Sequence, residues 1–133
     1  MSAGLTPEAR LAWLRPLLEP RSIAVIGASA RPGRPGHDVL KAARLFNTSQ
    51  DVFPVTPRYE EIDGLRCFES ISRVGQAVDL AIVASGAERL EAHAIEALQA
   101  GARSLVVFAR AESALIERIA GLARDWNVPV LGP

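Results

Sequence analysis

The sequence has one cysteine, no net charge and no long hydrophobic run, and each absence excludes a class of protein. Because Cys67 is the only cysteine, an internal disulfide is impossible and a reducing compartment is favoured. The 15 basic and 15 acidic residues balance, so bulk charge gives no attraction to nucleic acid. No run approaches the roughly 18 apolar residues of a membrane span. Charged residues interrupt the N-terminus, which leaves no signal-peptide core. We therefore expect a cytoplasmic protein without a membrane or nucleic-acid partner.

What is present suits one globular domain of 133 residues, of which 49% are hydrophobic. Short apolar runs recur along the chain, and their hydrophobicity is continuous rather than alternating. This pattern is typical of strands that are covered on both faces, as in a parallel sheet. The second run is weaker, because Pro54 lacks the N–H that a sheet ladder needs. The expected strands are residues 22–27, 51–55, 79–84, 104–109 and 127–131.

Helical patterns lie between these strands, at residues 36–46, 87–100 and 112–125. The alternation predicts an α/β fold: a Rossmann-like, doubly wound domain with about five strands in a mainly parallel sheet. Residues 57–77 are expected to form a loop with a short strand at 65–68. A further helix is expected at residues 6–18, capped by Thr6, stopped or kinked by Pro16, and packed on the outside of the sheet.

The strongest chemical signal is a Gly-rich turn after the first expected strand. Glycines let the backbone approach a ligand, and the next helix N-terminus stabilises an anion by roughly 0.3–1 kcal/mol. Gly27 and Gly36 are nine positions apart, whereas the dinucleotide fingerprint spans about five. An ordinary surface loop is the alternative, but the position after the first strand favours a phosphate site. Its candidate residues are Gly27, Ala28, Ser29, Arg31, Gly33, Arg34 and Gly36, with His37 at the start of the helix.

The end of the second strand separates the possible nucleotides. An NAD-binding domain places Asp or Glu there, to accept hydrogen bonds from the ribose. This chain has Thr56, Pro57 and Arg58 instead, and a cation suits the extra phosphate of NADP or of coenzyme A (CoA). Arg110 follows the fourth strand, so the ligand-binding edge leans positive. His93 is expected on a solvated helix face, and the two distant histidines and one cysteine predict no metal site.

Several segments, in order, resemble the CoA-binding domain of NDP-forming acyl-CoA synthetases, which is also the N-terminal part of the succinyl-CoA synthetase α subunit. The resemblance covers residues 17–133. It begins with Leu18 to Ser29 and continues with Val55-Thr56-Pro57-Arg58, similar to the family's V-N-P-K. Further matches are Glu61-Ile62-Asp63-Gly64 (E-x-x-G), Val78-Asp79-Leu80-Ala81-Ile82 (V-D-L-A-V) and Leu131-Gly132-Pro133 (the start of L-G-P-N).

The resemblance implies that the Gly-rich turn holds CoA phosphates, with Arg58 replacing the family's lysine. It also implies that Ala84-Ser85 and Ala109-Arg110 line the rest of the edge, near the acyl-thioester end. Those two turns differ from the family's Val-Pro-Ala-like and small-residue turns. We expect an N-terminal helical extension (residues 1–17) and a CoA-binding domain (residues 18–133).

The expected ligand is CoA or acyl-CoA, and this chain alone is expected to bind without catalysing. The family's phosphohistidine domain and ATP-grasp module are absent, so ligase and ATP-grasp domains or subunits are the expected partners; a homodimer is left open. Two alternatives also stay open: an NAD(P)-binding oxidoreductase domain, and a regulatory or interaction domain that has lost its ligand.

Overall fold

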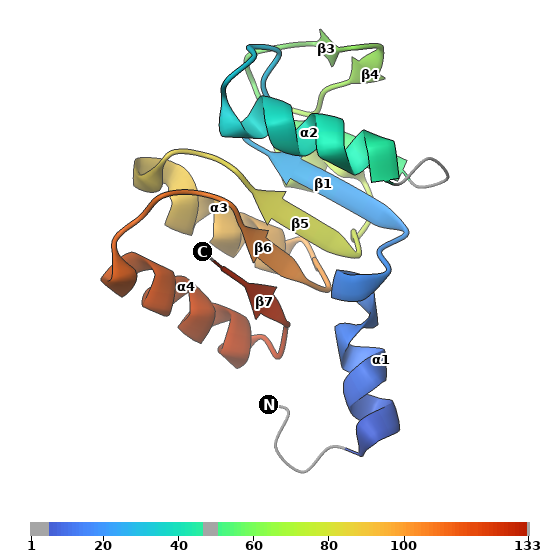
Figure 1. Cartoon of the computed structure of the whole chain (residues 1–133), viewed down its shortest axis with the longest axis vertical. Coiled ribbons are helices and arrows are strands. Elements are labelled where there is room, and N and C mark those ends of the chain that lie inside the picture. The colour runs from blue at the N-terminus through green and yellow to red at the C-terminus, as the bar shows by residue number, and fades with distance from the viewer. Residues whose placement is uncertain (1–5, 47–50, 133) are drawn as a thin grey trace.

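A five-stranded parallel sheet forms the centre of the computed structural model, which describes residues 6–46 and 51–132. Its strands are β1 (Ser22–Ile26), β2 (Asp51–Val55), β5 (Leu80–Val83), β6 (Leu105–Val107) and β7 (Val130–Leu131), in the order β2-β1-β5-β6-β7. Figure 1 shows β1, β5, β6 and β7 side by side. Every pairing between neighbours is parallel. The predicted α/β class and single doubly wound domain are confirmed. Pro54 is accommodated because β2 is an edge strand.

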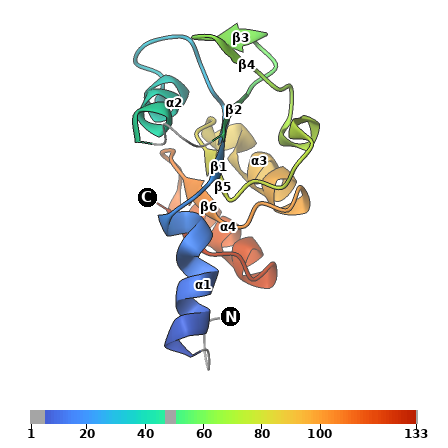
Figure 2. The same ribbon diagram turned by 90° about the vertical axis from the view of Figure 1, so that its right-hand side faces the viewer.

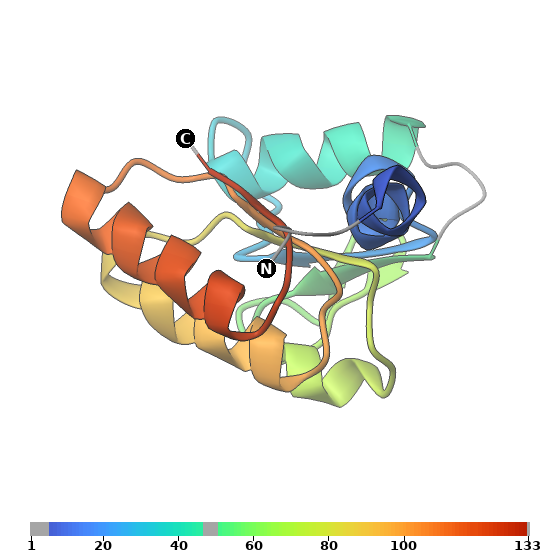
Figure 3. The same cartoon turned by 90° about the horizontal axis from the view of Figure 1, so that it is seen from below.

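Helices cover both faces of the sheet. Figure 3 shows α2 (Pro35–Phe46) on one face and α3 (Ala87–Gln99) with α4 (Ser113–Asp125) on the other. The core divides accordingly. Ile23 and Val25 of β1 pack in the cluster that includes α2, whereas Ala24 and Ile26 pack in the cluster that includes α3 and α4. Because β1 is central, all five of its residues are buried, which explains its continuous hydrophobicity.

Helices α3 and α4 end in the same C-terminal capping motif. After α3, the amide of Gly101 donates to the carbonyl of Leu98, and the amide of Ala102 donates to that of Ala97, both at 3.0 Å. Gly101 has a φ of 87°, as this Schellman motif requires. Asn127, with a φ of 55°, takes the same position after α4. Both helices therefore end within a residue of the sequence prediction.

The segment between β2 and β5 is more structured than predicted. The prediction of a loop with one short strand at 65–68 missed β3 (Glu61–Ile62), which forms an antiparallel hairpin with β4 (Leu65–Arg66), and the 3₁₀ helix η1 (Ile71–Val74). The physical reason lies in Asp63 and Gly64, whose φ values of 49° and 83° suit a two-residue hairpin turn. The amide of Phe68 then donates to the carbonyl of Pro54 at 2.9 Å, which ties the segment to β2.

The N-terminal helix α1 (Pro7–Leu18) differs from its prediction in two respects. Thr6 is the N-cap, as predicted, and its side chain accepts from the amide of Ala9 at 3.1 Å. However, of the two effects predicted for Pro16, a stop is wrong, because Pro16 lies inside the helix, which continues to Leu18; a kink stays a prediction. The expected packing against the outside of the sheet holds only at Leu17, which packs against the cluster of β1 and α2; most of α1 extends beyond the end of the sheet, and none of its residues is fully buried (Figure 2). Its apolar positions form no continuous stripe that could bury against the sheet.

Candidate functional site

A cleft of about 660 Å³ lies at the C-terminal ends of β1, β2, β5 and β6. The chain leaves β1 through α2 to reach β2 on one side, and later returns to place β5 on the other side of β1. Such a switch point in a parallel sheet opens a crevice where ligands bind. Most of the predicted site residues line this cleft: Gly27, Ala28, Ser29, Arg34, Gly36, Thr56, Pro57, Arg58, Ala84, Ser85, Ala109 and Arg110.

Three predicted residues do not line the cleft, although all three are described. Arg31 and Gly33 are exposed on the outer part of the loop. The ring Nδ1 of His37 lies 3.4 Å from the Asp38 carboxylate, so this histidine is oriented toward its neighbour. The loop between Ala30 and Arg34 is long enough to turn away from the sheet edge, which sequence spacing alone did not indicate.

Two glycines hold the Gly-rich turn against the rest of the fold. Gly27 has a φ of 88°, and a Cβ there would lie 2.9 Å from the amide nitrogen of Ser85. A Cβ at Gly36 would overlap the carbonyl of Gly27. These contacts join the start of α2, the end of β1 and the turn after β5 backbone to backbone. The glycines are therefore needed first for close packing, and this packing brings the turn to the cleft.

The same turn supplies groups that suit an anion. Within the described part of the chain, the amides of Ala28 and Ser29 make no hydrogen bond to the protein. Ser29 Oγ accepts from the amide of Arg31 at 3.0 Å, which fixes the turn. The N-terminus of α2 and the side chain of Arg34 complete this side of the cleft. Free amides, a helix N-terminus and a guanidinium are the groups that bind phosphate.

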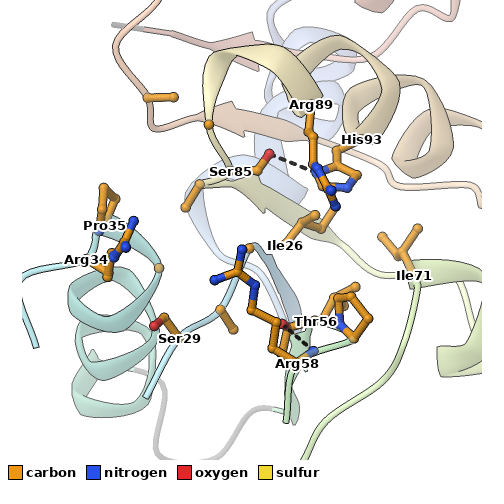
Figure 4. Close-up of a pocket in the computed structure, with 18 of the residues that line it drawn as sticks. Ile26, Ser29, Arg34, Pro35, Thr56, Arg58, Ile71, Ser85, Arg89 and His93 are labelled. Atoms are coloured by element: carbon orange, nitrogen blue, oxygen red, sulfur yellow. Dashed lines mark hydrogen bonds between the residues drawn. The ribbon is translucent and has the colours of Figure 1, made fainter. Parts of the chain in front are cut away.

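Arg58 occupies the neighbouring side, at the end of β2. Thr56 is 5% exposed, and its Oγ1 accepts from the amide of Arg58 at 3.2 Å. The amide of Thr56 donates to the carbonyl of Phe68 at 2.8 Å, so the turn is held from both directions. Figure 4 shows the Arg58 guanidinium extending into the cleft between Ser29 and Ser85. The hydrogen-bonded turn of Thr56, Pro57 and Arg58 therefore holds the Arg58 guanidinium at the site.

The opposite side carries a hydrogen-bonded pair that the sequence analysis did not anticipate. His93 Nδ1 and Ser85 Oγ lie 2.8 Å apart in the cleft (Figure 4). The prediction of a solvated His93 is wrong, because this face of α3 lies over the sheet edge and half-buries the ring. Burial lowers the pKa of His93 from its ordinary 6.5; the Glu96 carboxylate opposes this shift, and the Arg89 guanidinium adds to it. The lowered pKa favours the neutral form of the imidazole.

Most other residues missed by sequence reasoning come from α3 and from the η1 segment, and single residues come from β1, α2 and β2. Arg89, His93 and Glu96 are spaced by four and three residues, so they share one helix face. That spacing was visible, but only the sheet topology shows that the face meets the cleft. The unpredicted lining residues are Ile26, Pro35, Val55, Glu69, Ser70, Ile71, Gly86, Glu88, Arg89, His93 and Glu96.

Three further features of residues 6–46 and 51–132 concern metal ligands, helix length and the single cysteine. These residues contain no group of three or more His, Cys, Asp or Glu side chains placed to hold a metal ion. None of their helices is long and apolar enough to cross a membrane. Cys67 is a free thiol, and burial together with the Glu61 carboxylate raises its pKa above the ordinary 9.0. A thiol with a raised pKa is a poor nucleophile at neutral pH.

Comparison with known proteins identifies relatives of two sizes. An ADP-forming acetate–CoA ligase from Methanocaldococcus jannaschii is 29% identical over 119 residues, which cover 86% of this chain and 17% of the ligase. The structure of acetyl-coenzyme A synthetase 1 from Candidatus Korarchaeum cryptofilum superposes with a TM-score of 0.83 and 28% identity, over 90% of this chain and 27% of that one.

A shorter relative is a conserved hypothetical protein from Pyrococcus furiosus, with a TM-score of 0.70 and 32% identity, over 84% of this chain and 92% of that one. The chain therefore spans a small part of the long ligases and most of a short protein. The profile of the CoA binding domain family matches residues 21–133. This chain belongs to that family of CoA-binding domains, which is related to the NDP-forming acyl-CoA synthetases.

Proposed function

We propose that this chain binds CoA or acyl-CoA in the cleft at the C-terminal edge of the sheet. The observation that carries the proposal is that Arg58 extends into the same cleft as the free amides of the Gly-rich turn. These two groups suit two separated phosphates: a diphosphate at the turn, and a ribose phosphate at the end of β2. CoA carries both, whereas NAD lacks the second.

The chain fills the role of the CoA-binding module of an NDP-forming acyl-CoA synthetase, or of a short stand-alone relative. In the first case, the phosphorylated histidine and the ATP-grasp module belong to further ligase domains or subunits, and this chain contributes binding without catalysis. Within the cleft, Ser85 and His93 form the only hydrogen-bonded side-chain pair that the described residues provide. Neither is placed in a catalytic role by this proposal.

Residues 18–133 are proposed as the binding unit and residues 1–17 as a helical extension. Because α1 has no fully buried residue and only its half-buried Leu17 is among the residues packed against the described core, its removal should leave the sheet and the cleft intact. The Trp13 indole donates a hydrogen bond to the carbonyl of Asn127, at 2.8 Å, at the surface of the chain. A truncated chain that begins at Leu18 should therefore bind CoA as the full chain does, within about twofold.

A thermal-shift screen with CoA, acetyl-CoA, NAD and NADP tests the proposal. A ligand at about 100 times its Kd adds about 2.7 kcal/mol to the free energy of unfolding, which raises the Tm of a domain of this size by several degrees. CoA and acetyl-CoA should give this shift, and NAD should not. A shift with NAD or NADP alone would favour an oxidoreductase-type domain. No shift with any of the four would favour an interaction domain without a nucleotide.

A further inference from the structure

We infer that Ser85 and His93 form a docking point for an uncharged amide, and that this point receives the amide-bearing arm of CoA. The inference rests on the proposed function and adds a second half to the site. Its basis is the 2.8 Å contact between Ser85 Oγ and His93 Nδ1 inside the cleft, on the side facing away from Ser29 and Arg34 (Figure 4). The two residues come from the turn after β5 and from the second turn of α3.

The hydrogen-bonding capacity of the pair matches an amide in either tautomer. If the Ser85 hydroxyl donates to Nδ1, the ring offers Nε2–H as a donor and Ser85 Oγ keeps acceptor lone pairs. If Nδ1–H donates instead, the hydroxyl becomes the donor and Nε2 the acceptor. Within the described chain, Nε2 makes no other hydrogen bond. A neutral pair therefore presents one donor and one acceptor, the complement of a C=O and an N–H.

The charges around the pair disfavour a phosphate at this position. On this side, the cleft is lined by two arginines, Arg89 and Arg110, and two glutamates, Glu88 and Glu96, which balance. The Gly-rich turn and the turn after β2 contribute two arginines to the lining, Arg34 and Arg58, and no carboxylate, whereas Glu69 precedes η1. An anion is therefore attracted to the Gly-rich side, and an uncharged group meets no penalty on the α3 side.

The N-terminus of α3 supports the same assignment. Without a carboxylate nearby, the N-terminus of α3 would attract a phosphate, as the N-terminus of α2 does. However, the Glu88 carboxylate folds back over Gly86: a Cβ built at Gly86 would lie 2.8 Å from Glu88 Oε1. This carboxylate offsets the partial positive charge of the helix terminus. CoA has a charged end with phosphates and an uncharged arm with two amides, so its two ends fit the two sides.

The test compares two ligands that share the phosphorylated adenosine end. CoA has the amide arm, and adenosine 3′,5′-bisphosphate lacks it. Calorimetric titration at pH 7.5 should show CoA binding weakened about five- to tenfold by His93→Ala and by Ser85→Ala, the loss of about one hydrogen bond. Binding of adenosine 3′,5′-bisphosphate should change less than about twofold in both variants. His93→Gln, which keeps a donor and an acceptor, should restore part of the affinity for CoA.

Gln99→Ala is the matched control, because Gln99 is an exposed residue of α3 outside the cleft. Equal weakening of both ligands by His93→Ala and Ser85→Ala would overturn the inference, since it would indicate a general structural role. Unchanged CoA affinity in both variants would overturn it too. In either case, CoA binding by the unmodified chain would leave the proposed function standing. No CoA binding by the unmodified chain would overturn both.

Discussion

Each side of the cleft lies where a strand leads into a helix, but one side is held by backbone contacts and the other by side-chain contacts. The β1–α2 side is held by backbone contacts, in which Gly27 and Gly36 allow chain segments to touch. The β5–α3 side is held by side chains, with Ser85 bonded to His93 across the first two turns of α3. The first side carries positive charge and free amides, and the second is balanced in charge.

This difference explains which side can be found in a sequence. A backbone-built site requires glycine at fixed places, and glycine in a turn after a strand is conspicuous. A side-chain site on a helix uses residues spaced by three or four, which is also the pattern of an ordinary solvated face. Backbone packing, charge and side-chain titration are the three properties that distinguish the two sides, and each can be changed by one substitution.

The largest effect is expected from a methyl group on the backbone-built side. Gly36→Ala places a Cβ where it overlaps the carbonyl of Gly27, and neither backbone segment can move freely, so the free energy of unfolding should fall by about 3 kcal/mol. Gly33→Ala is the matched control. It has a φ of 89° but no atom within 4 Å of the added methyl, so only the left-handed backbone is penalised, by about 1 kcal/mol.

Urea unfolding of both variants, followed by circular dichroism, measures this contrast. A loss at Gly36 no larger than that at Gly33 would contradict the packing role, and would leave close approach to a ligand as the reason for glycine at position 36. CoA titration of the Gly33 variant gives a second reading. Since Gly33 lies outside the cleft, its CoA affinity should stay within about twofold of the unmodified chain.

Much of the fold was predictable from the sequence because local rules agree with the final structure. Continuous apolar runs marked the parallel strands, and Gly101 marked the end of α3. The hairpin at residues 61–66 was missed although Asp63-Gly64 is a recognised turn pair, because strands of two residues carry almost no pattern. The predicted position of α1 was largely wrong, because the local sequence does not show whether a weakly amphipathic helix finds a surface to cover.

The site divides in the same way. Thr56 and Arg58, next to a strand end, were predicted at the cleft because parallel strands end on one edge, and the family resemblance added Ser85. Arg31 and His37 were also predicted there but do not line the cleft, because a long loop and the rotation of a helix decide their directions. Arg89 and His93 were missed because the register of α3 over the sheet depends on packing of Leu90, Ala94 and Leu98 beneath it. Such packing is a tertiary property.

An intermediate effect is expected when charge is reversed on the positively charged side. Arg58→Glu removes a guanidinium that extends into the cleft and adds a carboxylate, so CoA affinity should fall about 30-fold, or about 2 kcal/mol. Lys41→Glu, on the exposed face of α2, makes the same change in net charge outside the cleft and should change affinity less than about threefold.

Titration at low and high salt separates local contact from the general field. The Lys41 effect should disappear above about 0.5 M salt, whereas most of the Arg58 effect should persist, because the Debye length is then only a few Å. Equal losses in the two variants would mean that CoA responds to net charge alone, and Arg58 would then have no direct place in the site.

The smallest effect belongs to the side-chain side, where His93 titrates. Burial lowers its pKa in the folded chain, so the unfolded chain binds the proton more tightly, with a pKa near the ordinary 6.5. The free energy of unfolding should therefore be constant above pH 7.5 and should fall as the pH drops through 6.5 toward the lowered pKa. The Glu96 carboxylate limits this decline and the Arg89 guanidinium enlarges it.

His93→Gln keeps a polar side chain without a titratable ring, so this component of the pH dependence should disappear. Urea unfolding between pH 5.5 and 8, measured as the difference between the variant and the unmodified chain, isolates it from carboxylates that both chains share. Gln99→Ala should retain the full decline. If the His93→Gln difference stays flat across this range, the ring has the same proton affinity in both states, and the neutral imidazole that distinguishes the α3 side of the cleft would not be a consequence of folding.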